Sequence, residues 1–181
     1  MLREEIIKII ELPQGTQART EGRTLVIKGK KGETKRLIFD PKMKMTIEGN
    51  EITLTVKRPS KREKRTINTN SAHIKNMVRG ANEGHIYKLK LCASHFPATA
   101  AVSGKEFIVK NFLGEKIPRV LKIREGATVK IAGTEITVES TNIETAGQVS
   151  GSIEQLLRIT NRDRRVFQDG IFIVEKPGDT K

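Results

Sequence analysis

The side chains that could ligate a metal or act as a nucleophile lie near the middle of the chain. They are His85, Cys92 and His95. A structural zinc site usually has four ligands, and this cluster offers three at irregular spacing. A cysteine nucleophile would also need a base oriented by a third group, and the sequence suggests none. We therefore favour a buried cysteine between ordinary histidines, and we expect no metal and no other cofactor.

The sequence also lacks the usual phosphate-binding loop of a nucleotide enzyme. Gly114, Glu115 and Lys116 are not preceded by the upstream glycine that shapes such a loop. Most acidic residues are interleaved with lysine and arginine, which is typical of surface ion pairs and not of a matched acid–base couple. The sequence therefore predicts a protein that is not an enzyme and has no small-molecule substrate.

One run of basic residues is a candidate phosphate-binding surface. Residues 57–65 hold six basic side chains and one acidic side chain, and the basic ones are Lys57, Arg58, Lys61, Arg62, Lys64 and Arg65. Each phosphate that such a run neutralises adds about 0.9 to the salt dependence of binding to a nucleic-acid duplex. The alternative is a solvated loop and helix start that only keeps the protein soluble.

A second candidate is the segment of residues 161–170, which precedes the predicted last strand. It contains three arginines, an aromatic ring and two amides: Arg162, Arg164, Arg165, Phe167, Asn161 and Gln168. A planar guanidinium can pair with phosphate or stack on a base. Two aspartates lie among the arginines, and they either hold the arginines in place for a ligand or simply pair with them. The spacing alone favours neither interpretation.

The whole chain carries an excess of positive charge. Its 181 residues include 34 Lys and Arg against 21 Asp and Glu, a formal net charge of +13. Residues 1–80 hold 19 basic and 9 acidic side chains, a net of +10, whereas residues 81–181 hold 15 and 12, a net of +3. An excess of this size on a folded chain attracts polyanions, so nucleic acid is the expected partner.

The sequence predicts neither a membrane protein nor a secreted one. Its longest strictly apolar run is residues 171–174, far below the roughly 20 residues that a membrane-spanning helix needs. The N-terminal stretch mixes acidic residues into its apolar positions, unlike a signal peptide. The single cysteine rules out an internal disulfide and points to a reducing compartment. We expect a soluble cytoplasmic protein.

Similar segments recur about eighty residues apart and predict a duplicated fold. Residues 25–28 resemble residues 107–110, and residues 47–54 resemble residues 131–138. Each member of the second pair predicts a hairpin around a Gly-Asn or Gly-Thr turn. A helical pattern of apolar residues follows in each half. We therefore expect an α+β protein with two tandem duplicated domains, each a small, mostly antiparallel sheet with hairpins packed against a helix.

The two predicted helices can be placed by their apolar spacing. The first is marked by Ile67, Ile74, Met77 and Val78, and the second by Val149, Ile153, Leu156 and Leu157. Gly80 should end the first helix and Asn142 should cap the second. Residues 80–84 have the composition of a linker, so we expect an N-terminal domain of residues 1–81 and a C-terminal domain of residues 82–181. Strands are expected at residues 87–91 and 171–175.

Four blocks of the sequence carry a resemblance to a known family. They are residues 71–80 (SAHIKNMVRG), 94–97 (SHFP), 111–116 (NFLGEK) and 164–171 (RRVFQDGI). In type and order they are similar to blocks of the large-subunit ribosomal protein family called L-six in bacteria and archaea, with a eukaryotic counterpart called L-nine. The resemblance is closest to the archaeal and eukaryotic branch and runs from about residue 3 to residue 177. The duplicated two-domain fold of that family agrees with the repeat.

The resemblance implies a structural protein of the large ribosomal subunit that binds the large-subunit rRNA near its 3′ end. Binding would occur chiefly through the second domain, close to the sarcin–ricin loop and the platform where translational GTPases dock. Neighbouring ribosomal proteins would be further partners, and any effect on the GTPases would be indirect. Residues 162–170 then become the leading RNA contact. The full set of candidate RNA-binding residues is Arg162, Arg164, Arg165, Phe167, Gln168, Lys116, Arg119, Arg158, Lys57, Arg58, Lys61, Arg62, Lys64 and Arg65.

Two alternatives remain open from the sequence. A basic protein that coats nucleic acid non-specifically would bind any duplex of equal length equally well. An RNA-processing enzyme would need a metal or cofactor, for which the sequence supplies no ligand set. Charge alone favours RNA binding by the first domain, whereas the resemblance favours the second. Both hold if the first domain supplies a diffuse field and the second supplies placed contacts.

Overall fold

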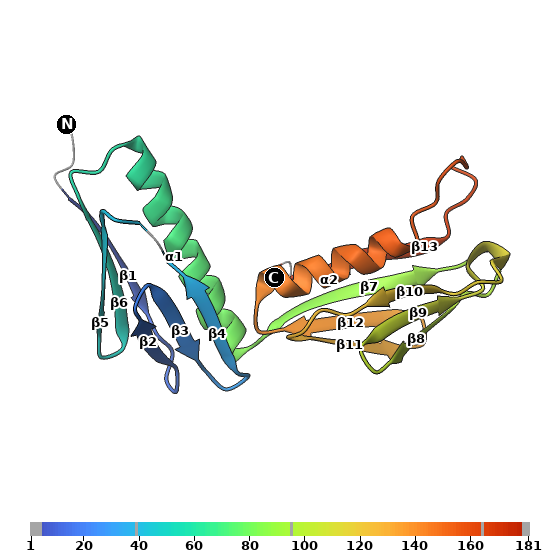
Figure 1. Cartoon of the computed structure of the whole chain (residues 1–181), viewed down its shortest axis with the longest axis horizontal. Helices are drawn as coiled ribbons and strands as arrows, with labels where there is room; N and C mark the ends of the chain where they lie inside the picture. The colour runs from blue at the N-terminus through green and yellow to red at the C-terminus, as the bar shows by residue number, and fades with distance from the viewer. Residues whose placement is uncertain (1–4, 39, 95, 164, 179–181) are drawn as a thin grey trace. The chain divides into compact units, whose positions relative to one another are not determined.

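The computed structural model describes residues 5–38, 40–94, 96–163 and 165–178. Its contacts divide the chain into two compact units, Met1–Gly84 and His85–Lys181 (Figure 1). The division falls three residues after the boundary expected at residue 81. Each unit combines antiparallel sheets with one long helix, so the expected α+β class and the expected duplication are confirmed.

The first unit contains two three-stranded antiparallel sheets. One has the order β1-β6-β5, with β1 (Glu5–Glu11), β6 (Glu51–Lys57) and β5 (Met43–Glu48). The other has the order β2-β3-β4, with β2 (Gln17–Glu21), β3 (Thr24–Lys28) and β4 (Glu33–Leu37). The hairpin expected at residues 47–54 is the β5–β6 pair, where Ile47 faces Ile52. Gly49 turns this hairpin with a φ of +56°, a conformation open to glycine without steric cost.

The helix of the first unit, α1 (Lys61–Asn82), buries the four apolar residues that predicted it. They pack into one core with Ile52, Leu54 and Val56 of β6. The expectation that Gly80 ends this helix was wrong, and residues 80–82 are helical and not a linker. Tertiary bonds hold the last turn, because the Lys31 backbone N–H donates to the Ala81 carbonyl at 2.8 Å and Asn82 Nδ2 donates to Thr16 Oγ1 at 2.9 Å.

The second unit contains a four-stranded and a three-stranded antiparallel sheet. The first has the order β11-β12-β7-β13, with β11 (Ala127–Ala132), β12 (Glu135–Ser140), β7 (His85–Cys92) and β13 (Gly170–Glu175). The second has the order β10-β9-β8, with β10 (Arg119–Lys122), β9 (Glu106–Lys110) and β8 (Thr99–Ser103). The short 3₁₀ helix η1 (Phe112–Gly114) and the helix α2 (Ile143–Leu156) complete the unit.

The pairing of strands repeats from one unit to the next. The set β1-β6-β5 with α1 corresponds to β7-β12-β11 with α2, and β2-β3-β4 corresponds to β8-β9-β10. The second unit adds one strand, β13, which pairs antiparallel with β7. Because β13 follows α2 in the chain, a connecting segment must run from the end of that helix back to the edge of the sheet. This segment contains the arginine-rich residues 161–170.

The helix α2 begins as the sequence predicted. Asn142 is its N-cap, and its side chain accepts a hydrogen bond from the Glu144 backbone N–H at 2.9 Å. Val149, Ile153 and Leu157 are buried in the core of the second unit, and the strands expected at residues 87–91 and 171–175 lie within β7 and β13. None of the helices in the described part of the chain is long and apolar enough to cross a membrane.

Candidate nucleic-acid interface

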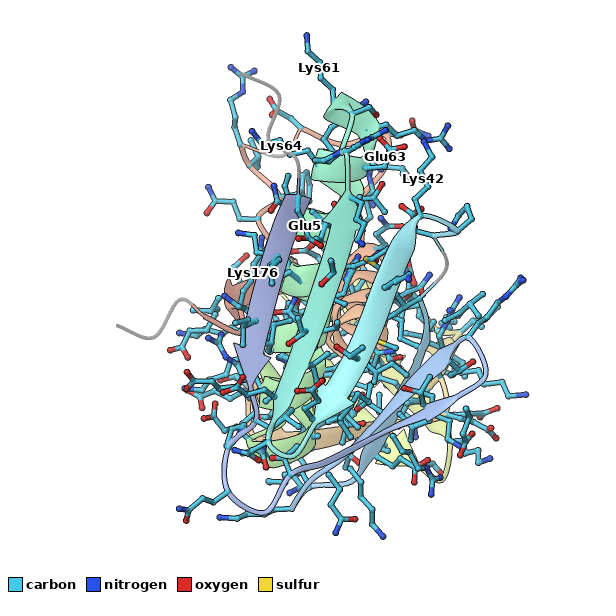
Figure 2. All side chains as sticks on the ribbon, turned by 90° about the vertical axis from the view of Figure 1, so that its left-hand side faces the viewer. Glu5, Lys42, Lys61, Glu63, Lys64 and Lys176 are labelled. Atoms are coloured by element: carbon cyan, nitrogen blue, oxygen red, sulfur yellow. The ribbon has the colours of Figure 1, made fainter. Side chains whose placement is uncertain are left out.

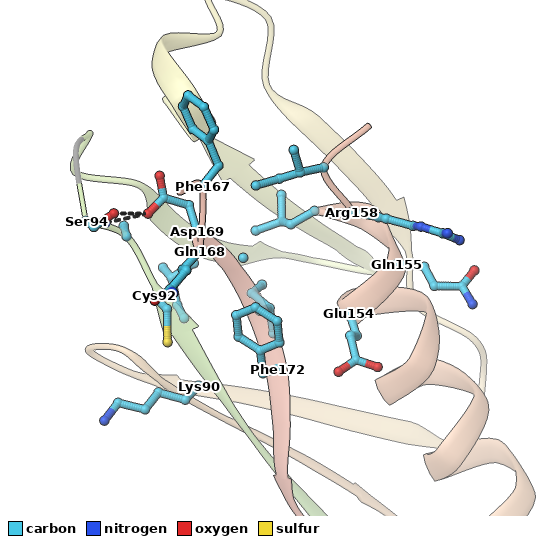
Figure 3. A pocket seen from close by; sticks show the side chains of 16 residues that line it. Lys90, Cys92, Ser94, Glu154, Gln155, Arg158, Phe167, Gln168, Asp169 and Phe172 are labelled. Atoms are coloured by element: carbon cyan, nitrogen blue, oxygen red, sulfur yellow. Dashed lines mark hydrogen bonds between the residues drawn. The ribbon is translucent and has the colours of Figure 1, made fainter. Parts of the chain in front are cut away.

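The segment that joins α2 to β13 is anchored at its end by a buried carboxylate. Asp169 is 5% exposed and accepts hydrogen bonds from the backbone N–H and the hydroxyl of Ser94, at 2.5 and 2.7 Å (Figure 3). Ser94 lies just after β7, 75 residues away in the sequence. The carboxylate thus fixes the end of the segment to the sheet. Sequence reasoning missed this contact, although both residues lie in the blocks that carry the family resemblance.

A tight turn built on Asp163 shapes the middle of the segment. The Asp163 carbonyl accepts from the backbone N–H groups of Val166 and Phe167 at 3.1 and 2.9 Å. Asn161, just before the turn, has a φ of +58°, the left-handed conformation that asparagine tolerates better than most residues. The turn brings the Arg162 guanidinium over the Phe167 ring, 4.8 Å from its centroid. Arg162 is therefore held at an exposed position by an aromatic face.

Arg165 lies on the same turn and is almost fully solvent-exposed. Its Nη2 is 3.0 Å from Asp163 Oδ2, and its backbone N–H donates to Asp163 Oδ1 at 2.9 Å. These bonds hold the pKa of Asp163 below its ordinary value. The Arg165 side chain is nevertheless 91% exposed, so its guanidinium remains accessible to a ligand. Of the two aspartates, one pairs with an arginine and the other anchors the segment.

The remaining predicted residues of this region surround a hollow. A cavity of about 1000 Å³ lies between the end of α2 and the strands β7 and β13. Phe167, Gln168 and Arg158 line it, together with Phe172 on the edge strand (Figure 3). Aromatic faces, an amide and a guanidinium are the groups that bind unstacked RNA bases and phosphates. Arg164, which the sequence also predicted, lies outside the described residues.

The guanidinium of Arg119 is bonded to other residues of the second unit. Its Nε and Nη2 donate to the Glu115 carboxylate at 2.8 and 2.6 Å, and its Nη1 donates to the Leu156 carbonyl at 2.7 Å. The guanidinium also stacks on the Phe112 ring, 4.7 Å from its centroid. The pair lowers the pKa of Glu115 and raises the pKa of Arg119. This geometry favours a structural role for Arg119, whereas neighbouring Lys116 is exposed.

In the first unit, the basic run of residues 57–65 extends from the end of β6 into α1. Lys57 ends β6, Arg58 lies on the connection, and the other four basic residues lie within the first five residues of α1. All six are exposed. The one acid of the run, Glu63, is 8% exposed and turns back to the start of the helix. Its carboxylate accepts from the Ser60 backbone N–H at 2.9 Å, and the Ser60 side chain accepts from the Glu63 backbone, so the two residues form a capping box. The carboxylate also accepts from the Ser60 hydroxyl and from Lys42 Nζ at 3.0 Å.

These bonds, the one from the Ser60 hydroxyl first, lower the pKa of Glu63 to about 2. Glu63 is therefore ionised near neutral pH, and its carboxylate is bonded to Ser60 at the helix start and to Lys42. The basic side chains around it remain on the surface without that acid as a partner.

The two described members of the potential metal cluster do not converge. His85 and Cys92 lie at opposite ends of β7 and, seven residues apart, on opposite faces of the strand. His95 lies outside the described residues. Within the described ranges, no three His, Cys, Asp or Glu side chains are grouped as metal ligands would be.

Comparison with known proteins agrees with the two-unit architecture. The model of the family described as ribosomal protein L6 matches residues 12–84 and 96–170, one segment in each unit. The large ribosomal subunit protein uL6 of Methanococcus vannielii is 39% identical over 178 residues, which cover 98% of this chain and 96% of that protein. The uL6 protein of Methanosarcina mazei is 37% identical over 173 residues, covering 96% and 98%. The chain belongs to the ribosomal protein L6 family.

Proposed function

We propose that this protein is an architectural RNA-binding component of the ribosome. As a member of the L6 family, whose archaeal relatives are named as proteins of the large ribosomal subunit, it is a ribosomal protein of the cytoplasm and not an enzyme. Its partners are ribosomal RNA and other ribosomal proteins. Its work is to hold RNA in place, with positioned cations offsetting the repulsion between phosphates.

The more specific part of the proposal concerns which RNA is bound. The family resemblance implies large-subunit rRNA near its 3′ end, close to the sarcin–ricin loop and the docking region of translational GTPases. The carrying observation is the anchored segment between α2 and β13, where exposed Arg162 and Arg165 are held by Phe167 and Asp163. Cations whose positions are fixed before binding lose less conformational entropy on contact with phosphate.

Substitution of the two arginines tests the assignment. The Arg162→Ala/Arg165→Ala variant should weaken binding to a 3′-proximal fragment of large-subunit rRNA about tenfold or more, because two phosphate contacts and their counterion release are lost. A matched control is Lys122→Ala/Lys130→Ala, which removes the same charge from exposed strand positions of the same unit. Binding is measured by filter retention or anisotropy, with duplex DNA as competitor and at two salt concentrations.

The outcomes separate the candidate functions. The proposal is supported by tight binding that is confined to the 3′-proximal fragment and persists with competitor at the higher salt. This binding must be lost in the arginine variant but not in the control. Equal binding to every RNA and DNA, collapsing together as salt rises, would show a non-specific coating protein instead. If the arginine variant and the control variant bind the fragment equally well, the segment between α2 and β13 is not part of the RNA interface.

A further inference from the structure

The solvent face of α1 carries two pairs of cations, one near each end of the helix, with neutral residues between them. Positions 61, 65, 68, 72, 75 and 79 recur at spacings of three and four and so share one face of the helix. They are Lys61, Arg65, Asn68, Ala72, Lys75 and Arg79, and all six are exposed. We call this set the α1 stripe. At 1.5 Å per residue it spans about 27 Å.

The stripe has no negative charge beside it on the helix. Glu63 is the only acidic residue of α1, and it is buried, bound to Ser60 and to Lys42. Figure 2 shows Lys61 and Lys64 projecting at the start of the helix, with Glu63 directed toward Lys42. The exposed side chains of α1 are therefore either cationic or uncharged.

In the described part of the chain, the cations of the stripe form no ion pair. None of Lys61, Arg65, Lys75 and Arg79 lies within 4.0 Å of a carboxylate among the residues that the structure describes. Elsewhere in the same unit, surface cations do pair, as Arg19 does with Glu21 and Lys35 with Glu33. Glu11 and Glu83 line the same hollow as Lys75 and Arg79, but within the described ranges neither forms an ion pair with them within 4.0 Å.

Such an arrangement is unfavourable for the isolated helix. Lys61 and Arg65, and again Lys75 and Arg79, are like charges four residues apart, which repel each other on a helix surface. The basic residues of the first turn also lie where the helix dipole disfavours positive charge. A bound polyanion would offset both the repulsion between these cations and their unfavourable interaction with the helix dipole. The stripe contains no aromatic side chain on which a base could stack, so the complementary ligand is a phosphate backbone.

We propose that the α1 stripe is a second RNA-binding surface, which contacts the sugar-phosphate backbone of an RNA helix without reading its sequence. The inference rests on the proposed function in that the available polyanion is ribosomal RNA. Together with the segment between α2 and β13, it gives one chain two separate RNA contacts. The protein can then join two RNA segments and not only cover one.

The first experiment isolates the stripe with a sequence-neutral probe. The full chain is titrated with a mixed-sequence RNA duplex longer than the stripe, at 50 and 200 mM salt. The stripe variant is Lys75→Gln/Arg79→Gln, which keeps helix-forming residues. The control variant is Lys28→Gln/Lys44→Gln, which removes two exposed lysines from β3 and β5 of the same unit. Circular dichroism confirms that each variant is folded.

The expected result follows from counterion release. Loss of two phosphate contacts lowers the salt slope by about 1.8, so the affinity advantage of the unaltered chain over the stripe variant should shrink about 12-fold between 50 and 200 mM salt. The control variant should keep the slope of the unaltered chain. Equal slopes for the stripe and control variants would overturn the inference, because net charge alone would then explain duplex binding.

A second measurement separates this inference from the proposed function. A 3′-proximal rRNA fragment is immobilised, the protein is added, and retention of the labelled duplex is measured. The unaltered chain should retain duplex, and the stripe variant should lose most of it while still binding the fragment. If the stripe variant retains as much duplex as the unaltered chain, the inference is overturned. The same result is expected if the stripe binds an acidic protein and not RNA. Loss of fragment binding by the unaltered chain would instead overturn the proposed function.

Discussion

Replacement of Arg119 should damage the second unit and not its RNA contacts. The guanidinium of this residue joins three parts of the unit: Glu115 in the loop before β10, the Phe112 ring and the Leu156 carbonyl at the end of α2. The Leu156 carbonyl is one of the last four of its helix, which have no partner within the helix. Arg119→Ala therefore leaves a partly buried acceptor without its donor.

The size of the loss can be worked from these contacts. A hydrogen bond from a charged donor is worth about 1.5–3 kcal/mol, the stacking on Phe112 about 0.5–1 kcal/mol, and a part-exposed ion pair about 0–1 kcal/mol. Since such terms are not additive within one cluster, we expect a loss of about 3 kcal/mol. With a urea dependence of about 2 kcal/mol per molar, the unfolding midpoint should fall by about 1–2 M.

The sequence provides a probe specific for this unit. The chain has one tyrosine and no tryptophan, and Tyr87 lies on β7 of the second unit, so tyrosine fluorescence during urea unfolding reports that unit alone. Lys116→Ala, at an exposed neighbouring position, is the control and should change stability by less than about 0.5 kcal/mol. If the Arg119→Ala variant unfolds at the unaltered midpoint and yet loses RNA binding, Arg119 is an RNA contact and not a structural residue.

Three further predictions test single contacts. Glu63→Gln should flatten the pH dependence of the free energy of unfolding between about pH 4.5 and 2, measured by urea unfolding. The Glu63 carboxyl has its folded pKa lowered to about 2, so it stabilises the fold above its ordinary pKa of 4.5 and loses this effect as pH falls. Asp169→Ala should cost about 1–3 kcal/mol by tyrosine fluorescence and speed amide exchange in the segment between α2 and β13. Gly29→Ala should cost about 1–3 kcal/mol by thermal unfolding, because its Cβ would lie 2.6 Å from the Ala81 carbonyl oxygen, whereas Gly151→Ala, with open space at its Cβ, should not destabilise.

Local patterns were sufficient to predict both long helices and part of the strands. The two hairpins and two helices depend on turn residues and apolar spacing within short windows, and each was found where expected. The predicted end of α1 at Gly80 was wrong because the last turn is stabilised by contacts from Lys31 and Thr16, which are distant in the sequence. The order of the strands could not be predicted for the same reason, since it depends on pairings such as β13 with β7.

The candidate site was predictable in location but not in its internal bonds. The composition of residues 161–170 identified a cluster of arginines, and the structure places Arg162 and Arg165 on its surface. The different roles of the two aspartates depend on Ser94, which no spacing within the segment indicates. Likewise, nothing in the short NFLGEK block at residues 111–116 shows that the nearby arginine is bonded to the end of α2.

We propose that charge and family resemblance point to different units because each unit holds its cations in a different way. In the second unit, Arg162 and Arg165 are individually positioned by a ring and a carboxylate, which favours contacts of fixed geometry. In the first unit, the cations of the α1 stripe form no ion pair within the described ranges, which favours a long-range field. Long-range fields act mainly on the rate of association, whereas placed contacts act mainly on the rate of dissociation. Removal of Lys75 and Arg79 should therefore slow RNA association, more strongly at low salt, and removal of Arg162 and Arg165 should speed release.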